Sequence, residues 1–472
     1  MIINIPKNFG LFHFVGIGGI GMSGIAEILI KSGYKVQGSD VSSSKIIDRL
    51  ISLGIKIYIG HDEKNIQDAS IVVYSSAIKQ NNPEIVEAKK LFIPIIHRSE
   101  MLSELMKLKK SIAIAGTHGK TTTTSLISKI LDTNKMDPTI INGGIISSLA
   151  SNAKLGQGKW MVVEADESDG SFSKLMPTVA VITNIDLEHL DFHKNEKNLE
   201  NAFINFISSI PFYGFCAVCI DHPRVQKIFS NLKNRKIITY GLSPNSDIKA
   251  ENIIVKNQKM YFDVIYKNKT NGKNYVIKKI SFSMLGLHNI QNALASISIA
   301  LELNISPDTI KLALKNFNGV QRRFQLIDKY QNTKIIDDYG HHPEEIKAAL
   351  SATKLIGEKS KVLAVFQPHR YSRLKNHFNE FCSCFNDADE VILLNVYAAG
   401  EKLITNCNNI DLENGIRNYG HKNVSSVTND EDIYKIILKK INNYQIIIFL
   451  GAGNITKIAN NLKKELKKLT KK

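Results

Sequence analysis

Short apolar runs alternate with helical patterns along most of this chain. The runs at residues 11–15, 112–115 and 160–163 have the length and the bounding turn residues of buried strands. Segments such as 22–31 and 120–131 follow two of these runs, and their apolar residues recur at helical spacing. Alternating strands and helices predict sheets covered by helices. We therefore expect an α/β protein.

The length of 472 residues suggests about three domains at roughly 150 residues each. The pattern places them at 1–108, 109–318 and 319–472. We expect a Rossmann-like first domain, a central P-loop ATPase-like α/β domain and a Rossmann-like third domain. Further strands are predicted at 35–38, 70–74, 178–183, 334–336, 361–366, 390–394 and 445–450, with a helix at 201–210 and hairpins between 248 and 282.

The central domain begins with a glycine-rich turn between a strand and a helix. The turn reads Gly116-Thr117-His118-Gly119-Lys120-Thr121, a shortened form of the general phosphate-loop pattern, with Thr122 next. Amide groups at the helix start point at a phosphate, the lysine adds a positive charge, and the threonine hydroxyl can bind Mg²⁺. The sequence therefore predicts that the protein binds a nucleoside triphosphate.

Acidic and histidine side chains follow the next two predicted strands. Glu164 stands at the tip of the strand 160–163, where a Walker-B-type Mg²⁺ ligand is expected. A lone histidine is usually a satisfied core or surface residue. His189, however, follows the end of the strand 178–183, and α/β sheets bind ligands at the carboxyl ends of their strands.

A second glycine pattern occurs near the start of the chain. Gly16, Gly18 and Gly21 form G-x-G-x-x-G directly after the strand 11–15. Asp40 follows the next strand and can hold a ribose hydroxyl. The motif requires only a pyrophosphate beside a ribose, so NAD and a UDP-linked ligand satisfy it equally.

Polar clusters follow three predicted strands of the third domain. They occupy residues 337–344, 367–373 and 395–401. Three clusters at the strand ends of one sheet are better interpreted as one site than as solvated surface. Arg370 and Arg373 have the planar guanidinium groups that bind a carboxylate or phosphate bidentately.

Composition narrows the functional class. The net charge is +17, from 61 basic and 44 acidic residues, but the lysines are scattered and accompany no nucleic-acid motif. No apolar run approaches the ~18 residues of a membrane helix, and the amino terminus lacks a signal-peptide core. We expect a cytoplasmic protein without membrane insertion or nucleic-acid binding. The odd count of five cysteines argues against a disulfide framework, and we expect them in the core.

Taken together, the motifs resemble the Mur ligase family, the ATP-dependent amide-forming enzymes of peptidoglycan synthesis. The resemblance rests on the two glycine loops, the segment 164–172, Leu287-His-Asn, 319–324 and 337–342, and it continues through 367–373, 397–401 and Gly451-Ala-Gly. These segments span the whole chain in order. The resemblance favours a UDP-sugar at the first loop over NAD. It implies that the lactyl carboxylate of UDP-N-acetylmuramate attacks ATP, and that L-alanine then attacks the acyl phosphate.

The resemblance also implies roles for individual residues. The positions matching the UDP-sugar site are Gly16, Gly18, Gly19, Gly21, Met22, Ser39, Asp40 and Ser75. Those matching the ATP site are Gly116, Thr117, His118, Gly119, Lys120, Thr121, Thr122, Asn289, Asn292, Arg322 and Asp338, and those matching the Mg²⁺ site are Thr121, Glu164 and His189. Those matching the amino-acid site are Tyr339, His341, His369, Arg370 and Arg373. Catalytic roles fall to Lys120, His189, His341 and Arg370.

Several alternatives remain open at this point. A sister ligase that attaches a whole peptide in cell-wall recycling shares most motifs. An NAD-dependent oxidoreductase would leave the phosphate loop unexplained, and a non-catalytic nucleotide-binding protein would not need Lys120, Thr121 and Glu164. Some family members use a carbamylated lysine, for which Lys194 and Lys197 lie in the right neighbourhood. We expect a monomer or weak homodimer whose domains close to assemble the site.

Overall fold

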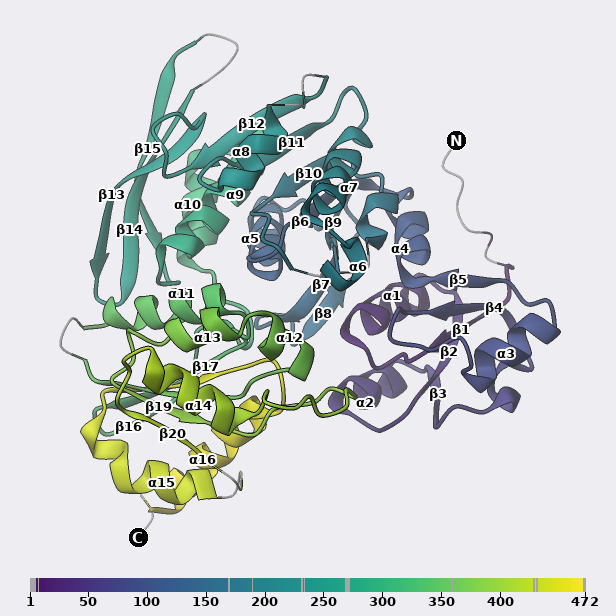
Figure 1. The fold of residues 1–472 in the computed structure, drawn as a ribbon. Helices are drawn as coiled ribbons and strands as arrows, with labels where there is room; N and C mark the ends of the chain where they lie inside the picture. Colours follow the sequence, from purple (N-terminus) through teal and green to yellow (C-terminus); the bar gives the residue numbers. More distant parts are fainter. Residues whose placement is uncertain are drawn as a thin grey trace. The chain divides into compact units, whose positions relative to one another are not determined.

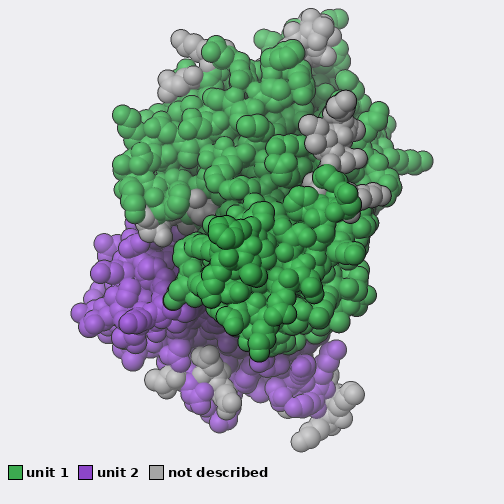
Figure 2. All heavy atoms as spheres, turned by 90° about the vertical axis from the view of Figure 1, so that its right-hand side faces the viewer, with its two compact units in different colours: residues 1–253, 261–282, 289–318 green, residues 254–260, 283–288, 319–472 purple. Residues whose placement is uncertain are grey.

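Three separate β-sheets organise the chain (Figure 1). The computed structural model describes residues 6 and 8–469, except 169, 189, 231, 233, 268–271, 358–359, 428 and 430–431. The first two sheets belong to one compact unit, made of residues 1–253, 261–282 and 289–318, and the third belongs to a second unit, made of 254–260, 283–288 and 319–472 (Figure 2). This mixed α/β architecture with three sheet-containing domains confirms the predicted fold class.

The first sheet has five parallel strands in the order β3-β2-β1-β4-β5. Its strands are β1 (Leu11–Val15), β2 (Lys35–Asp40), β3 (Lys56–Ile59), β4 (Ala69–Tyr74) and β5 (Ile95–His97). Its helices are α1 (Ile20–Lys31), α2 (Lys45–Ser52), α3 (Pro83–Lys90) and α4 (Arg98–Met106), with the 3₁₀ turn η1 (Glu63–Ile66). The strand order reverses between β1 and β4, which creates the crevice where such sheets bind ligands.

Two predicted boundaries in this sheet are corrected. The helix after the glycine loop begins at Ile20 and not at Met22, because Gly19 already has the extended conformation of an N-cap. Strand β2 continues to Asp40 and does not end at Gly38, since it pairs with β3 up to that residue.

The second sheet has ten strands in the order β15-β14-β13-β12-β11-β10-β6-β9-β7-β8. They are β6 (Lys110–Ala115), β7 (Thr139–Ile146), β8 (Ser151–Lys154), β9 (Trp160–Glu164), β10 (Val179–Ile182), β11 (Phe215–Cys219), β12 (Lys236–Gly241), β13 (Ile248–Lys256), β14 (Lys259–Lys267) and β15 (Asn274–Phe282). The helices are α5 (Lys120–Thr133), α6 (Leu190–His193), α7 (Glu196–Ser208), α8 (Pro223–Phe229), α9 (Leu287–Glu302) and α10 (Pro307–Lys315), with η2 (Ser171–Lys174). Strand β6 lies between β9 and β10 and is parallel to both, which places their carboxyl ends side by side.

The interior of this sheet agrees with the sequence pattern, although one helix was misplaced. The apolar residues of β6 and β10 are almost fully buried. Helix α7 begins at Glu196 and not at residue 201, because the Asn195 side chain caps it by accepting a hydrogen bond from the amide of Asn198. All five cysteines are buried, as expected.

The third sheet has six strands in the order β16-β17-β21-β18-β19-β20. They are β16 (Gln325–Tyr330), β17 (Thr333–Asp338), β18 (Val362–Phe366), β19 (Glu390–Leu393), β20 (Val424–Ser426) and β21 (Ile446–Leu450). Its helices are α11 (Pro343–Lys354), α12 (Tyr371–Asn376), α13 (Phe378–Ser383), α14 (Asn409–Asn418), α15 (Asp432–Lys440) and α16 (Ile455–Leu469), with η3 (Ile441–Asn443). Apolar clusters cover both faces. Only β16 is antiparallel to its neighbour among the strand pairs of this sheet that the structure describes.

Strand β17 is longer than its predicted core at 334–336. It includes Asp337 and Asp338, which therefore face opposite sides of the sheet. Asp337 accepts a hydrogen bond from the Thr456 hydroxyl at 3.2 Å, whereas Asp338 accepts the amide of Gly340. Within the described ranges, no helix combines the length and the apolar character needed to cross a membrane.

Candidate active site

The turn between β6 and α5 has the geometry of a phosphate-binding loop. Gly116 and Gly119 adopt left-handed backbone conformations, with φ angles of 130° and 82°. A β-carbon at Gly116 would lie 2.1 Å from the Thr183 hydroxyl oxygen, and one at Gly119 would lie 2.4 Å from Oδ1 of Asn292. Only glycine fits both positions, since a side chain would add a collision to the backbone strain. The turn therefore brings the amino-terminal end of α5 to the edge of the sheet, where helix amides bind phosphate.

Lys120 begins α5, and three oxygen acceptors surround its ammonium group. Nζ donates hydrogen bonds to the carbonyl oxygens of Gly116 at 2.5 Å and Thr117 at 3.0 Å, and to Oε1 of Glu167 at 2.8 Å. Burial opposes the charge, but the carboxylates of Glu167 and Glu164 outweigh burial and raise the pKa of Lys120. Lys120 is therefore a positive charge fixed inside the phosphate loop.

Glu167 is a residue of this site that sequence reasoning missed. Its side chain is 4% exposed. Burial raises the pKa of Glu167, and the charge of Lys120 opposes this shift and favours the ionised carboxylate. Its Oε2 atom has no hydrogen-bond partner in the part of the chain that the structure describes. The sequence feature that could have identified Glu167 is its position three residues after Glu164, in the acidic segment that follows β9.

Two side chains near this loop carry the kind of oxygen atom that binds Mg²⁺. Glu164 ends β9 and pairs with Ile114 of β6, so it lies beside the loop, and its Oε2 accepts the amide of Gly143 at 2.8 Å. Thr121 stands in the first turn of α5. Carboxylate and hydroxyl oxygens are the ligands that Mg²⁺ prefers. His189, the other predicted metal ligand, lies outside the described residues.

The two predicted asparagines of α9 lie beside the phosphate loop. Oδ1 of Asn292 accepts a hydrogen bond from the Thr123 hydroxyl at 3.2 Å, and its Nδ2 donates to Oδ1 of Asn289 at 3.3 Å. Both asparagines are buried. Asn292 therefore connects α9 to α5, and recognition of the nucleotide base by this pair stays a prediction.

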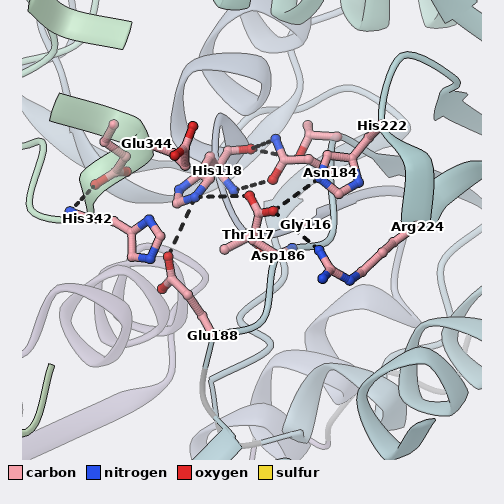
Figure 3. A network of polar contacts seen from close by, with 12 residues as sticks. Gly116, Thr117, His118, Asn184, Asp186, Glu188, His222, Arg224, His342 and Glu344 are labelled. Carbon is pink, nitrogen blue, oxygen red and sulfur yellow. Dashed lines mark hydrogen bonds and ion pairs between the residues drawn. The ribbon is translucent and has the colours of Figure 1, made fainter. Parts of the chain in front are cut away.

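Two residues predicted to bind ATP use their amides to shape the loop (Figure 3). The amide of Thr117 donates to the carbonyl oxygen of Asn184 at 3.1 Å, and the amide of His118 donates to Oδ1 of Asn184 at 2.7 Å. Amides held in this way are not the ones that the turn presents to a phosphate. We expect the phosphate-binding amides to begin at Gly119, and Thr122 follows in the first turn of α5.

The first glycine loop is held by the end of β2. The amide of Gly16 donates to the carbonyl oxygen of Ser39 at 2.8 Å, and the amide of Gly18 donates to Oδ2 of Asp40 at 2.9 Å. The hydroxyl of Ser39 donates to Oε2 of Glu84 at 2.6 Å, and Ser39 is fully buried. The Ser39 hydroxyl is therefore bound within the protein interior, and contact of Ser39 with the UDP-sugar stays a prediction.

The remaining residues predicted to bind the UDP-sugar differ in how exposed their side chains are. Met22 is 2% exposed and belongs to the core, so this position can serve a ligand only through its backbone. Ser75 follows β4 and is half-buried at the crevice edge. Sequence reasoning missed Arg98, whose guanidinium lies against Gly21 and forms an ion pair with Asp166 at 3.0 Å.

In the second unit, Arg322 and Asp338 bind the protein's own backbone. The Arg322 guanidinium lies 4.6 Å from the ring centroid of Tyr339 and donates to the carbonyl oxygen of Gly451 at 2.7 Å. Burial lowers the pKa of Arg322. Oδ2 of Asp338 accepts the amide of Phe324 at 2.6 Å. Contact of either residue with ATP therefore stays a prediction.

The predicted amino-acid residues of the second unit form a cluster of rings and guanidinium groups. The ring centroids of His341 and His369 are 5.9 Å apart, and His369 stacks on Tyr397 at 5.5 Å. An Arg373 nitrogen lies 3.3 Å from Nδ1 of His369. Burial lowers the pKa of His341 to about 3 and that of His369 to about 4. Both imidazoles are therefore neutral at pH 7.

Arg370 differs from this cluster in its exposure. It is exposed, its backbone has a φ angle of 70°, and its amide donates to the carbonyl oxygen of Tyr397 at 2.9 Å. A non-glycine residue in the left-handed region is uncommon and is held here by that hydrogen bond. The loops after β18 and β19 thus fix the Arg370 backbone and leave its guanidinium accessible.

Comparison with known proteins gives a consistent result along the chain. Residues 11–110 match the Mur ligase family catalytic domain, residues 114–300 the Mur ligase middle domain, and residues 322–453 the Mur ligase glutamate ligase domain. Relatives include the UDP-N-acetylmuramate–L-alanine ligase of Rhodospirillum rubrum, which is 50% identical over 98% of this chain and 96% of its own. The corresponding ligase of Bartonella henselae is 48% identical over 98% of both chains.

Solved structures agree with these matches. The UDP-N-acetylmuramate–alanine ligase of Thermotoga maritima superimposes with a TM-score of 0.82 at 29% identity, covering 97% of this chain and 99% of its own. A murein peptide ligase from Psychrobacter arcticus, at 23% identity and a TM-score of 0.72, shares the fold over 97% of this chain and 98% of its own. On this evidence, together with the two glycine loops and the buried lysine, the chain belongs to the Mur ligase family.

Proposed function

We propose that this protein joins L-alanine to the lactyl carboxylate of UDP-N-acetylmuramate and uses ATP to activate that carboxylate. The observation that carries the proposal is the phosphate loop of the first unit, where Lys120 is buried and charged beside the acidic end of β9. Full-length relatives named for this reaction support the choice of substrates. ATP and UDP-sugars are cytoplasmic metabolites, so we also propose a cytoplasmic enzyme.

A carboxylate is a poor electrophile, so one of its oxygens must become a leaving group. Transfer of the γ-phosphoryl group of ATP to that oxygen gives an acyl phosphate and releases ADP, and attack by the amine of L-alanine on the acyl carbon then releases phosphate. Phosphoryl transfer depends mainly on positioning and on neutralisation of charge. Lys120 supplies a fixed positive charge for that purpose, and the amides at the start of α5 orient the triphosphate.

Bound Mg²⁺ would neutralise further charge on the triphosphate. We assign Thr121, Glu164 and His189 to it from the sequence. In the second unit, the guanidinium groups of Arg370 and Arg373 suit the carboxylate of alanine. The attacking amine must be deprotonated, and His341, with a pKa of about 3, is too weak a base to take its proton. We therefore propose that the neutral imidazole of His341 helps to position the amine.

The proposal can be tested by following phosphate release. Purified protein with ATP, Mg²⁺ and UDP-N-acetylmuramate should release phosphate only when L-alanine is present. Lys120→Ala should abolish this release, whereas Lys89→Ala, in the exposed part of α3, should leave it unchanged. Release with a cell-wall tripeptide but not with alanine would replace the proposal with the recycling ligase. No release with either acceptor would refute both.

A further inference from the structure

The phosphate loop is held by the segment that follows β10. The hydroxyl of Thr183 donates to the carbonyl oxygen of His118 at 2.6 Å, and the amide of Asp186 donates to the Thr117 hydroxyl at 2.8 Å. Asn184 bonds both the amide and the carbonyl oxygen of His118. A loop with two left-handed glycines has high conformational freedom of its own. Its shape therefore depends on these external contacts.

The Asp186 carboxylate is the charged centre of this arrangement, and it contacts two histidines (Figure 3). Oδ2 lies 3.4 Å from Nε2 of His118 in the loop, and Oδ1 lies 3.1 Å from Nε2 of His222. Glu188 adds a second carboxylate oxygen 3.5 Å from the same His118 nitrogen. Partial burial of Asp186 would favour its neutral form, but its bonds to His118 and His222 outweigh burial and hold the pKa of Asp186 well below its usual range.

Asp186 also connects the loop to the neighbouring βα unit. His222 precedes α8, which follows β11, the strand paired with β10. Arg224 of α8 lies 3.7 Å from Oδ1 of Asp186, and its Nε donates to Glu196 of α7 at 3.1 Å. Asp186 thus links His118 of the loop to α8, and Arg224 extends this link to α7.

We propose that Asp186 is a positioning residue that preorganises the phosphate loop for the triphosphate through its contacts with His118 and His222. A loop already held in its binding conformation loses less freedom when the nucleotide binds. Asp186 does not itself touch the nucleotide in this account. The inference rests on the proposed use of ATP, and it adds a residue to which neither the sequence motifs nor the resemblance gave a role.

Calorimetric titration with Mg-ADP is the direct test, because it requires no other substrate. Asp186→Asn keeps the size and the backbone bond to Thr117 but removes the charge, and it should weaken Mg-ADP binding about tenfold. Asp186→Glu should recover part of that loss. Asp132→Asn is the matched control, since it removes the carboxylate charge of an ion pair with Lys154, away from the loop. The control should bind Mg-ADP like the wild type.

Kinetics separate positioning from simple destabilisation. Asp186→Asn should raise the KM for ATP about tenfold and change the KM for UDP-N-acetylmuramate less than about twofold. His222→Gln breaks the same arrangement from the other side, so its effect on Mg-ADP affinity should be smaller and less than additive with Asp186→Asn. If Asp186→Asn does not fold, the Mg-ADP affinity of His222→Gln is the measurement that tests the proposal.

The outcomes distinguish this inference from the proposed function. A wild-type protein that fails to bind Mg-ADP would overturn the use of ATP itself. A wild type that binds, together with an Asp186→Asn variant that binds equally well, would overturn the positioning role alone. Equal increases in both KM values, accompanied by a lower melting temperature, would reduce Asp186 to a structural residue.

Discussion

The ammonium group of Lys120 lies 2.8 Å from the Glu167 carboxylate, and both side chains are largely buried. With the carbonyl oxygens of Gly116 and Thr117, this bond uses all three donors of the lysine. A phosphate oxygen that binds Lys120 must therefore replace one of these acceptors. Glu167 supplies the negative charge that a nucleotide would otherwise supply.

Replacing Glu167 with Gln should destabilise the nucleotide-free protein more than the nucleotide-bound one. Gln keeps a hydrogen-bond acceptor but leaves a buried lysine without its counterion, which we expect to cost about 2 kcal/mol. Saturating Mg-ADP should reduce this difference, because its phosphates provide negative charge. Thermal melts of wild type and variant, with and without Mg-ADP, measure this.

The exposed pair Glu104–Lys107 gives the control for this experiment. Glu104→Gln should leave both melting temperatures unchanged, since exposed ion pairs contribute little. An equal loss in Glu167→Gln with and without Mg-ADP would contradict the idea that Glu167 substitutes for the phosphates.

Gly119→Ala should weaken Mg-ADP binding at least about tenfold. The new β-carbon would lie 2.4 Å from Oδ1 of Asn292, so either the loop or α9 must move. Gly54→Ala is a close control, because Gly54 has a similar φ angle of 88° but no atom within 4 Å of an added β-carbon. Gly54→Ala should cost about 1 kcal/mol of stability and leave Mg-ADP affinity unchanged. Comparable affinity losses in both variants would rule out the steric explanation.

Arg373→Lys should raise the KM for L-alanine about tenfold and leave the KM for ATP unchanged. Lysine keeps the charge but loses the planar fork that binds a carboxylate bidentately. Steady-state kinetics with each substrate varied in turn measure this. Arg417→Lys, at an exposed arginine that pairs with Glu413, serves as the control. A KM for L-alanine that stays at the wild-type value in Arg373→Lys would remove this residue from the amino-acid site.

His341 should make the protein less stable as the pH falls below about 6.5. Its folded-state pKa is about 3, whereas an unfolded histidine has a pKa of about 6.5, so only the unfolded state binds the proton between these values. Stability is therefore full above the unfolded pKa and is lost progressively as the pH drops toward 3. Between pH 7 and pH 5 the loss from this residue is about 2 kcal/mol.

Urea denaturation at several pH values tests this assignment. His341→Gln should lose less stability than the wild type between pH 7 and pH 5, by the same amount of about 2 kcal/mol. Above pH 7.5 the two curves should run parallel, because neither state binds the proton there. Parallel curves over the whole range would mean that His341 has the same pKa in the folded and the unfolded protein.

Much of the fold could be predicted from local patterns of apolar, polar and glycine residues in the sequence. The strand at Leu11–Val15 was predicted at its observed boundaries, and both glycine loops were found with the helices that follow them. Such elements depend on contacts between residues close in sequence, and the spacing of Gly116 and Gly119 marks the positions where the turn needs positive φ angles. The family resemblance has the same basis, because its motifs are short and ordered.

The partners of individual side chains were decided by tertiary structure alone. The hydroxyl of Ser39, a residue predicted to bind the UDP-sugar, bonds to Glu84, which lies 45 residues away. Glu167 reaches Lys120, and Asp186 reaches His118, only because β9 and β10 flank β6 in the second sheet. No local pattern specifies this order of strands. The sequence by itself determined which chemistry the loops carry, and the packing of distant strands determined which side chains hold those loops in place.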